Sequence, residues 1–304
     1  MDITLTLKCN NNCIFCPRDK FLSLINYKSP IESYRAIKKI RKTSNHIVLT
    51  GGEPTIIKDL YKIVKFCKKQ GFICIEIITN GRLLKNEKYV SELISAGVTG
   101  FAISLYSVSN NIHDSMTRVS GSCKETKMGI INVLRMINNN NPAIRINMVL
   151  NLLNYKDIFK TINYLYRLGV RNYIIAEQIM TDNKQKHLSV SQTKKILRSI
   201  KDYRFPGAHI VLRGFAPCFF NGHLTISDDS IIVKKNNPVI FLEAPNIDTL
   251  IQEEVKKQKY IKAFLNNFRR DEQCIKCLFT ERCFGFGRWY EEKPGLRHKE
   301  KNII

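Results

Sequence analysis

Apolar and polar positions follow two different periods along the first part of the chain. Alternating or wholly apolar short runs predict strands, whereas apolar residues three and four apart predict amphipathic helices. The predicted strands cover residues 3–7, 46–50, 72–79, 99–105, 144–150 and 171–177. A first helix is predicted to begin at residue 29, and further helices cover residues 58–69, 87–96, 124–137, 157–168 and 189–200. Strands and helices therefore alternate, as is typical of βαβ units.

This alternation predicts an α/β fold with a parallel sheet and right-handed connections. Eight strand–helix units would close a full barrel, so six predict an open six-stranded (β/α)6 partial TIM barrel. Two of the predicted helices begin with a capping box, one from Ser29 to Glu32 and the other from Ser189 to Gln192. These side chains fix where the helices begin.

The pattern changes after about residue 205. Pro206 and Gly207 end the last regular helix, and short strand-like pieces follow. A turn at residues 227–230 predicts a hairpin of residues 224–226 with residues 231–233. A further helix is expected over roughly residues 247–268. We therefore predict two domains, residues 1–205 and residues 206–304.

The chain of 304 residues has 49 Lys and Arg against 26 Asp and Glu, which gives a formal net charge of +23. Such a balance favours anionic partners, among them nucleic acid, acidic peptides and phosphorylated metabolites. The basic residues are spread along a chain rich in Lys, Asn and Ile, so we do not expect a dedicated nucleic-acid site. Neither a signal peptide nor a spanning apolar run is visible, and we expect a cytoplasmic protein without a membrane partner.

Three of the ten cysteines stand together just after the first predicted strand. Cys9, Cys13 and Cys16 form a C-x3-C-x2-C pattern. Three thiolates on one short loop can hold a [4Fe–4S] cluster and leave one iron open, because such clusters usually take four cysteines. A structural zinc site needs four ligands, and the loop contains neither histidine nor a fourth cysteine.

A second motif follows the second predicted strand directly and consists of Gly51, Gly52, Glu53 and Pro54. Glycine lets the backbone approach a ligand closely, and the carboxylate of Glu53 can receive an ammonium group. Ligands of parallel α/β sheets bind at the carboxyl ends of the strands. We therefore expect this turn and the cysteine loop to serve one site.

Together these two motifs resemble those of radical S-adenosylmethionine (SAM) enzymes. The resemblance implies that Cys9, Cys13 and Cys16 hold a [4Fe–4S] cluster whose open iron chelates the amino and carboxylate groups of SAM. It implies that Phe15 is the usual aromatic residue before the third cysteine, and that the GGEP segment at residues 51–54 holds the SAM amino group. Reduction of SAM by the cluster would give methionine and a 5′-deoxyadenosyl radical, which abstracts a hydrogen atom from a substrate.

Less specific matches to the same family lie at the ends of later strands. Thr79, Asn80 and Gly81 end the third strand with a tripeptide that is common there. The resemblance implies that Ser104 contacts SAM and that Asn147 lies near its ribose. Ordinary hydrogen bonding at strand ends is the alternative for both side chains.

Four more cysteines lie in the second predicted domain. Cys274, Cys277 and Cys283 form a C-x2-C-x5-C pattern, and Cys218 stands upstream of them. Four thiols are enough for one complete cluster, while a zinc site remains the alternative on spacing. The surroundings resemble the SPASM and twitch domains of radical SAM enzymes, which hold auxiliary [4Fe–4S] clusters. Full SPASM domains have more cysteines, so we expect one auxiliary cluster of twitch type, with Cys218 as a candidate fourth ligand.

A few other residues complete the set of candidates. Two polar residues end the sixth strand and are candidates to face the pocket, namely Glu177 and Gln178. His113 and Asp114 could orient substrate or SAM, or could cap a loop. The remaining cysteines and the late aromatic residues are expected to pack in the protein interior: Cys67, Cys74, Cys123, Trp289 and Tyr290.

We therefore expect a radical SAM oxidoreductase that modifies a ribosomally synthesised peptide, because many SPASM and twitch relatives do so and a basic surface suits an acidic leader peptide. The expected partners are a reductant such as ferredoxin or flavodoxin and, since the first strand begins at residue 3, a separate peptide-recognition protein. One alternative is dehydrogenation or epimerisation of a small metabolite such as a sugar. Another, from a different class, is a basic zinc or iron–sulfur protein that binds RNA.

Overall fold

The computed structural model describes most of the first 220 residues and parts of the remainder. The described residues are 1–16, 30–137, 142–178, 187–220, 225–227, 230–234, 239–243, 268–270, 272–275, 277, 283, 286–288 and 290. The chain divides into two compact units. Unit 1 comprises Met1–Asn147 and Lys160–Arg171, and unit 2 comprises Met148–Phe159 and Asn172–Ile304.

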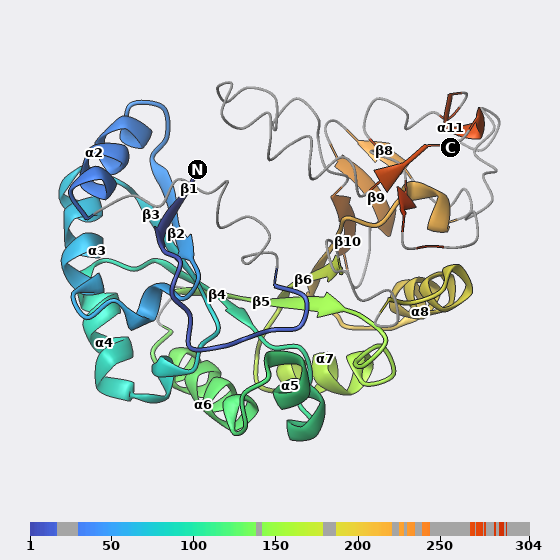
Figure 1. Cartoon of the computed structure of the whole chain (residues 1–304), viewed down its shortest axis with the longest axis horizontal. Helices are drawn as coiled ribbons and strands as arrows, with labels where there is room; N and C mark the ends of the chain where they lie inside the picture. The colour runs from blue at the N-terminus through green and yellow to red at the C-terminus, as the bar shows by residue number, and fades with distance from the viewer. Residues whose placement is uncertain are drawn as a thin grey trace. The chain divides into compact units, whose positions relative to one another are not determined.

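Unit 1 is built on parallel strands that pair in chain order (Figure 1). The strands are β1 (Asp2–Thr6), β2 (His46–Gly51), β3 (Cys74–Thr79), β4 (Gly100–Ser104) and β5 (Ala143–Leu150), of which β5 ends in unit 2. The helices are α2 (Pro30–Arg41), α3 (Leu60–Lys69), α4 (Glu87–Ala96), α5 (Asn110–Thr117), α6 (Ser122–Arg135) and α7 (Ile158–Arg167), of which α7 begins in unit 2, with short 3-10 helices η1 (Pro54–Ile56) and η2 (Leu83–Lys85).

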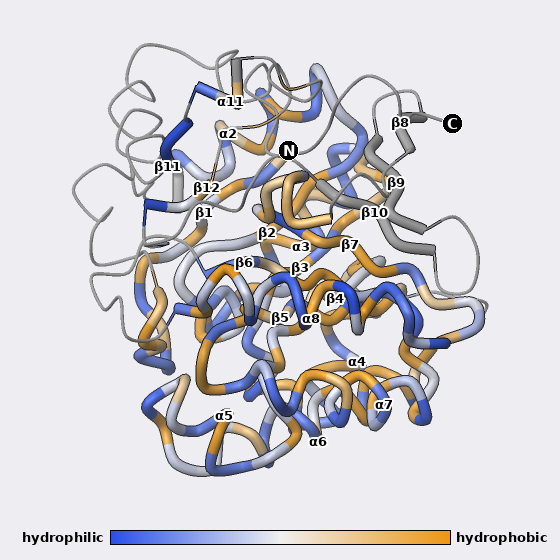
Figure 2. The backbone as a smooth tube through the Cα atoms, turned by 90° about the vertical axis from the view of Figure 1, so that its right-hand side faces the viewer, coloured by the Kyte–Doolittle hydropathy of each residue, from blue (hydrophilic) through white to orange (hydrophobic). Residues whose placement is uncertain are grey.

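The elements of unit 1 follow from local sequence. In β3 the buried and less buried positions alternate along CIEIIT, as a pleated strand requires. Helix α4 begins where the Asn86 side chain accepts a hydrogen bond from the Tyr89 backbone N–H, and ends at Gly97 with a φ of 124°. Figure 2 shows hydrophobic and hydrophilic positions alternating along helices such as α4 and α7. Their apolar faces form the core together with the strands.

Unit 2 combines parallel and antiparallel pairing. Strand β6 (Asn172–Glu177) pairs in parallel with β7 (His209–Arg213), and β7 pairs in parallel with β10 (Val239–Glu243). The hairpin β8 (Thr225–Ser227) and β9 (Ser230–Lys234) continues from β10 in antiparallel order. The other elements are α8 (Val190–Asp202), the 3-10 helix η4 (Pro217–Phe220), α11 (Glu272–Ile275) and the small pair β11 (Phe268–Arg269) and β12 (Phe286–Gly287).

The predicted fold class is confirmed: the fold is α/β, with the parallel strands β1–β7 in an unclosed barrel, and β10 continues from β7 in parallel. All six predicted strands are present, and β7 adds a seventh beyond residue 205. The capping box from Ser189 to Gln192 is confirmed as well. Helix α5 was not predicted from the sequence. Within the described part of the chain, no helix has both the length and the apolar character that crossing a bilayer requires.

Two other predictions have a different outcome. The capping residue Ser29 and the helix expected over residues 247–268 lie outside the described residues, except that Phe268 begins strand β11. The domain boundary at residue 205 stays a prediction, because the two compact units are divided at residues 147, 159 and 171. Cys67 and Cys123 are fully buried, as expected of packing thiols, and Cys74 is half-buried.

Candidate functional site

The three thiols of the first cysteine motif lie on the segment that directly follows β1. Cys9 and Cys13 are half-buried, and Cys16 is exposed. Burial is the main cause that raises the pKa of the Cys13 thiol to about 12, and the nearby Cys16 and Cys9 thiols contribute to this rise. The three sulfur atoms are therefore close enough to interact electrostatically, as the ligands of one cluster must be.

Backbone hydrogen bonds hold this cysteine loop in place. The Asn12 N–H donates to the Thr117 carbonyl at 3.0 Å, and the Ile14 N–H donates to the Met116 carbonyl at 2.9 Å. Both carbonyls belong to the last residues of α5. The helix that sequence analysis missed is therefore what supports the loop.

The glycine-rich turn after β2 packs against the residues that lead into the cysteine loop. The Gly52 N–H donates to the Thr6 carbonyl at 2.6 Å, and the Glu53 N–H donates to the Lys8 carbonyl at 2.9 Å. A Cβ atom would stand 2.3 Å from the Thr6 oxygen at Gly51, where φ is +146°, and 2.2 Å from the Lys8 oxygen at Gly52. Only glycine therefore fits at these two positions.

Glu53 is the centre of the hydrogen bonding between the ends of β2 and β3. Its side chain is only 1% exposed. Oε1 accepts hydrogen bonds from the Thr55 N–H (3.0 Å) and from the hydroxyls of Thr55 (2.6 Å) and Thr79 (2.7 Å), and Oε2 accepts one from the Asn80 N–H (2.6 Å). Burial raises the pKa of this carboxyl, and the hydrogen bonds oppose the rise. Pro54, also buried, begins η1 directly after it.

Two residues that sequence analysis did not select as ligands tie β3 to the cysteine loop. The Asn80 Nδ2 donates to the Asn10 Oδ1 at 2.6 Å. Arg82 donates through Nη1 to the Asn10 carbonyl and to the Asn11 Oδ1 (3.0 Å), and through Nε to the Glu125 Oε2 (2.6 Å). The tripeptide at residues 79–81 was a signal for Asn80, whereas nothing in the sequence pointed to Arg82.

Ser104 and Asn147 face each other in register on the neighbouring strands β4 and β5. The Asn147 Oδ1 is buried and accepts no hydrogen bond from the described part of the protein. A buried acceptor without a donor is costly unless a ligand supplies one. Its environment fits a ribose hydroxyl, which is the group that the resemblance assigns to this position, and the roles of both side chains remain predictions.

Tyr106 is a further site residue that the sequence did not reveal. Its ring contacts Phe15 edge-to-face with centroids 4.8 Å apart, and stacks on His113 at 5.3 Å. Its hydroxyl is hydrogen-bonded to the side chains of Ser104 and Cys13. Burial lowers the pKa of His113 to about 4, and the Nδ1 of this neutral ring accepts a hydrogen bond from the Tyr106 N–H at 3.2 Å.

Asp114 acts as a loop cap, which was one of the two roles considered for it. Its carboxylate accepts hydrogen bonds from the Gly121 N–H (2.7 Å), the Ser122 hydroxyl (2.8 Å) and the Cys123 N–H (2.8 Å). These donors lie at the beginning of α6. The pKa of Asp114 is lowered because the hydrogen bonds to these donors outweigh the opposing effect of desolvation.

Three cysteines of unit 2 lie close enough to Cys218 to interact with it electrostatically. Cys218 in η4 is buried, and Cys274, Cys277 and Cys283 are half-buried. Burial raises the pKa of the Cys218 thiol, and the thiols of Cys283, Cys274 and Cys277 raise it further, in that order. Among the described residues, no three His, Cys, Asp or Glu side chains gather as ligands of a single metal ion.

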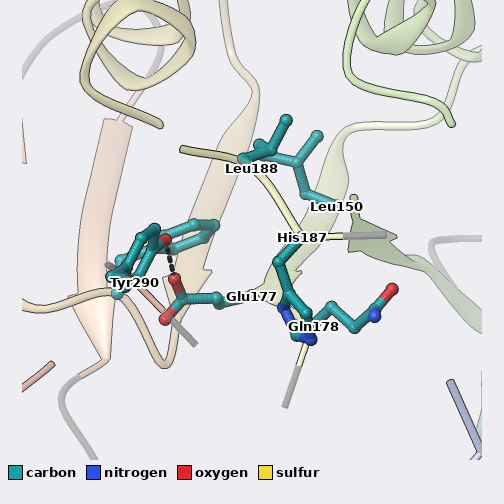
Figure 3. Close-up of a pocket in the computed structure, with 7 residues that line it drawn as sticks. Leu150, Glu177, Gln178, His187, Leu188 and Tyr290 are labelled. Carbon is teal, nitrogen blue, oxygen red and sulfur yellow. Dashed lines mark hydrogen bonds between the residues drawn. The ribbon is translucent and has the colours of Figure 1, made fainter. Parts of the chain in front are cut away.

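A small cavity of about 10 Å³ lies in unit 2 at the carboxyl end of β6 (Figure 3). Its polar lining consists of Glu177, Gln178, His187 and Tyr290, so the last residue of β6 and the residue after it do line a cavity. The Tyr290 hydroxyl donates to the Glu177 Oε1. Burial raises the pKa of Glu177 to about 8, although this hydrogen bond opposes the rise. The carboxyl group is therefore mostly protonated at neutral pH.

Comparison with known proteins assigns the chain to a family. Residues 3–181, more than half of the chain, match the family model of the Radical SAM superfamily. The chain belongs to the Radical SAM superfamily. Membership implies a [4Fe–4S] cluster and SAM as cofactors. The thiols of Cys9, Cys13 and Cys16 and the unsatisfied acceptor of Asn147 fit these two groups.

Two curated relatives illustrate the similarity in sequence. The probable GTP 3',8-cyclase of Saccharolobus islandicus (strain Y.N.15.51) is 32% identical over 177 residues, which are 58% of this chain and 55% of the relative. The molybdenum cofactor biosynthesis protein moc-5 of Caenorhabditis elegans is 31% identical over 159 residues, 48% of this chain and 24% of the relative. The chain thus spans about half of the first relative and a quarter of the second.

Two solved structures share the fold. The crystal structure of Streptococcus suis SuiB bound to S-adenosylmethionine superposes with a TM-score of 0.61 at 14% identity, over 100% of this chain and 76% of SuiB. Native anSMEcpe with bound AdoMet and Kp18Cys peptide gives a TM-score of 0.62 at 16% identity, over 96% of this chain and 91% of that one. At such low identity the similarity concerns the fold alone.

Proposed function

We propose that this radical SAM enzyme carries a second, auxiliary [4Fe–4S] cluster bound by Cys218, Cys274, Cys277 and Cys283. The observation that supports this proposal is the electrostatic interaction of the Cys218 thiol with the other three. Complete ligation by four cysteines is the usual state of such clusters. The resemblance to twitch domains points to the same four residues.

The side chains of unit 1 have different roles at the SAM site. When bound, the first cluster and SAM supply a 5′-deoxyadenosyl radical that abstracts a hydrogen atom from the substrate. Cys9, Cys13 and Cys16 hold the cluster, and Glu53 keeps the glycine-rich turn in place beside them through four hydrogen bonds. Asn147 offers its Oδ1, which accepts no hydrogen bond from the described residues, as an acceptor.

The first candidate substrate is a purine nucleotide such as GTP. Sequence similarity supports it, since the GTP 3',8-cyclase relative is 32% identical over 177 residues, which are 58% of this chain. The net charge of +23 also suits a triphosphate. The reaction would then be a radical cyclisation of the nucleotide, which is a small-metabolite reaction.

The second candidate is a ribosomally synthesised peptide, which the enzyme would oxidise or cross-link. The observation that favours it is the C-x2-C-x5-C pattern at Cys274, Cys277 and Cys283, which resembles the SPASM and twitch domains of peptide-modifying enzymes. In this case a separate peptide-recognition protein would take part. Under either proposal we expect ferredoxin or flavodoxin as reductant and a cytoplasmic location, since free thiols require a reducing compartment.

Iron and sulfide analysis tests the auxiliary cluster. Protein reconstituted without oxygen should contain about eight irons, from two [4Fe–4S] clusters. A variant with Cys274, Cys277 and Cys283 changed to Ala should contain about four and still cleave SAM. Cys67→Ala, at a buried thiol outside both groups, is the control and should keep all of the iron. Zinc without sulfide at the C-terminal cysteines would refute the auxiliary cluster.

Stimulated cleavage of SAM tests the substrate. The reconstituted enzyme with SAM and reductant is given GTP, or the peptide fraction of the native cell extract, and 5′-deoxyadenosine is measured above the blank without substrate. Stimulation by GTP supports the nucleotide proposal. Stimulation by the peptide fraction alone refutes it and supports the second candidate.

A further inference from the structure

Tyr106 connects the end of β4 with the cysteine loop of unit 1. It lies two residues after Ser104, the last residue of β4, and is only 8% exposed. Its hydroxyl is hydrogen-bonded to the side chains of Cys13 and Ser104. All three residues belong to unit 1, so these contacts lie within one compact part of the chain. A buried tyrosine hydroxyl therefore reaches the sulfur atom of one of the three cysteines assigned to the SAM cluster.

The chemistry of a cluster ligand fixes the direction of these two hydrogen bonds. A cysteine that binds a metal is a thiolate and has no proton to donate, so the Tyr106 hydroxyl donates its only proton to the Cys13 Sγ. A tyrosine hydroxyl has an ordinary pKa of about 10 and keeps this proton at neutral pH. The Tyr106 oxygen can then only accept, and the Ser104 hydroxyl donates to it. The result is a chain of two hydrogen bonds that ends on the sulfur atom.

Two neighbouring rings hold the ring of Tyr106. The Phe15 ring packs against it edge-to-face with centroids 4.8 Å apart, and the His113 ring stacks on it at 5.3 Å. The Tyr106 N–H also donates to the His113 Nδ1 at 3.2 Å. His113 belongs to α5, whose last carbonyl groups accept the hydrogen bonds of the cysteine loop. Helix α5 therefore positions both the hydroxyl and the loop that it contacts.

The sulfur atom of Cys9 has donors of a different kind. It accepts a hydrogen bond from the Asn11 N–H at 3.3 Å, and every residue except proline supplies such a backbone donor. The Asn80 Nδ2 is 3.9 Å from the same sulfur atom, and its shorter contact is the one to the Asn10 Oδ1 at 2.6 Å. The Tyr106 hydroxyl is thus a side-chain donor to Cys13 that a single substitution can remove.

We propose that the Tyr106 hydroxyl raises the reduction potential of the SAM cluster through its hydrogen bond to the Cys13 sulfur atom. One electron from the external reductant enters the cluster, while no bond forms or breaks and no proton moves. The added negative charge is shared with the cysteine sulfur atoms, and hydrogen bonds to more negative acceptors are stronger. The donor therefore stabilises the reduced cluster more than the oxidised one. The inference rests on Cys13 as a cluster ligand and holds for either candidate substrate.

Redox titration of the reconstituted enzyme without SAM, followed by electron paramagnetic resonance, tests this inference. The spectrum of a variant without the three loop cysteines gives any auxiliary contribution, which is subtracted. Tyr106→Phe retains the ring but removes the donor. Reduction should become about tenfold less favourable, which for one electron is a shift of about 59 mV to more negative potential. Tyr34→Phe makes the same change in helix α2 and, as the matched control, should keep the wild-type potential.

A second replacement keeps the test valid if the phenylalanine variant loses its iron. Fluorotyrosine with the fluorine atom beside the hydroxyl is almost unchanged in size, and its more acidic hydroxyl is a stronger donor. Placed at residue 106, it should shift the potential in the opposite direction, to less negative values. Iron content and circular dichroism verify that each protein is intact.

The outcomes distinguish a hydrogen bond that acts on the cluster from a tyrosine that only packs. A shift to less negative potential with fluorotyrosine, and to more negative potential in any Tyr106→Phe protein that keeps its iron, supports the inference. A wild-type potential in the fluorotyrosine protein overturns it, assigns Tyr106 a structural role and leaves the SAM cluster standing. If removal of the three loop cysteines leaves the wild-type signal unchanged, the assignment of the cluster fails, and this inference fails with it.

Discussion

Glu53 provides the sharpest test of how the glycine-rich turn is held. We expect Glu53→Gln to destabilise the protein even without SAM, because every orientation of the new amide opposes a donor. If Nε2 replaces Oε2, it faces the Asn80 N–H, which now approaches at 2.6 Å. If it replaces Oε1, it faces three donors, from Thr55 and Thr79. At least one buried donor is therefore left unsatisfied.

The expected magnitude follows from these contacts. Losing a hydrogen bond to a charged group costs about 1.5–3 kcal/mol, and an unsatisfied buried donor costs about 1–3 kcal/mol. We expect a loss on the order of 3 kcal/mol, which at about 2–4 °C per kcal/mol lowers the melting temperature by roughly 10 °C. Anaerobic thermal unfolding of the reconstituted protein without SAM measures it.

A matched control distinguishes a structural role from a ligand contact. Glu92→Gln makes the same change at an exposed position and should alter the stability by less than about 0.5 kcal/mol. If Glu53→Gln has the same melting temperature as this control while its SAM binding is weaker, the side chain contacts only the ligand and our reasoning about the turn is wrong.

Three further predictions concern other parts of the structure. Gly52→Ala would place a Cβ atom 2.2 Å from the Lys8 carbonyl oxygen, and we expect this variant to lose the iron of the first cluster. The control Gly100→Ala, whose Cβ atom has its nearest neighbour at 3.6 Å, should keep that iron, and iron analysis of both variants tests the prediction. Glu177 has a raised pKa, so its contribution to stability is complete below pH 4.5 and is lost as the pH rises to about 8. Glu177→Gln should remove a pH dependence on the order of 5 kcal/mol, seen in melting temperatures between pH 5 and pH 8. Ser189→Ala removes the capping box of α8 and should cost about 1 kcal/mol, and equal melting temperatures would contradict this.

The regular elements could be predicted because their signals are local. The strand at residues 74–79 and the helix at residues 87–96 each show one clear period, and Asn86 and Gly97 mark the ends of the helix. Helix α5 escaped prediction because its eight residues are mostly polar and bury a face made of His113, Met116 and Thr117. Strand β7 is a run of five residues beyond the expected boundary, and its pairing with β6 and β10 is not visible locally.

Some residues of the site could likewise be predicted from local sequence, whereas others depend on tertiary contacts. The thiols could be found because cysteine spacing is a property of the sequence itself. Arg82 and Tyr106 could not, because their roles depend on partners distant in sequence: Arg82 contacts Asn10 and Asn11, and the Tyr106 hydroxyl contacts Cys13. The convergence of Cys218 with cysteines more than fifty residues later likewise required the fold.

The most direct test of the central claim is the formation of 5′-deoxyadenosine. Protein reconstituted without oxygen is incubated with SAM and a strong reductant, beside a variant in which Cys9, Cys13 and Cys16 are all Ala. We predict 5′-deoxyadenosine and methionine in equal amounts from the wild-type protein and neither from the variant. A wild-type protein that is fully loaded with iron and sulfide but leaves SAM intact would contradict the account.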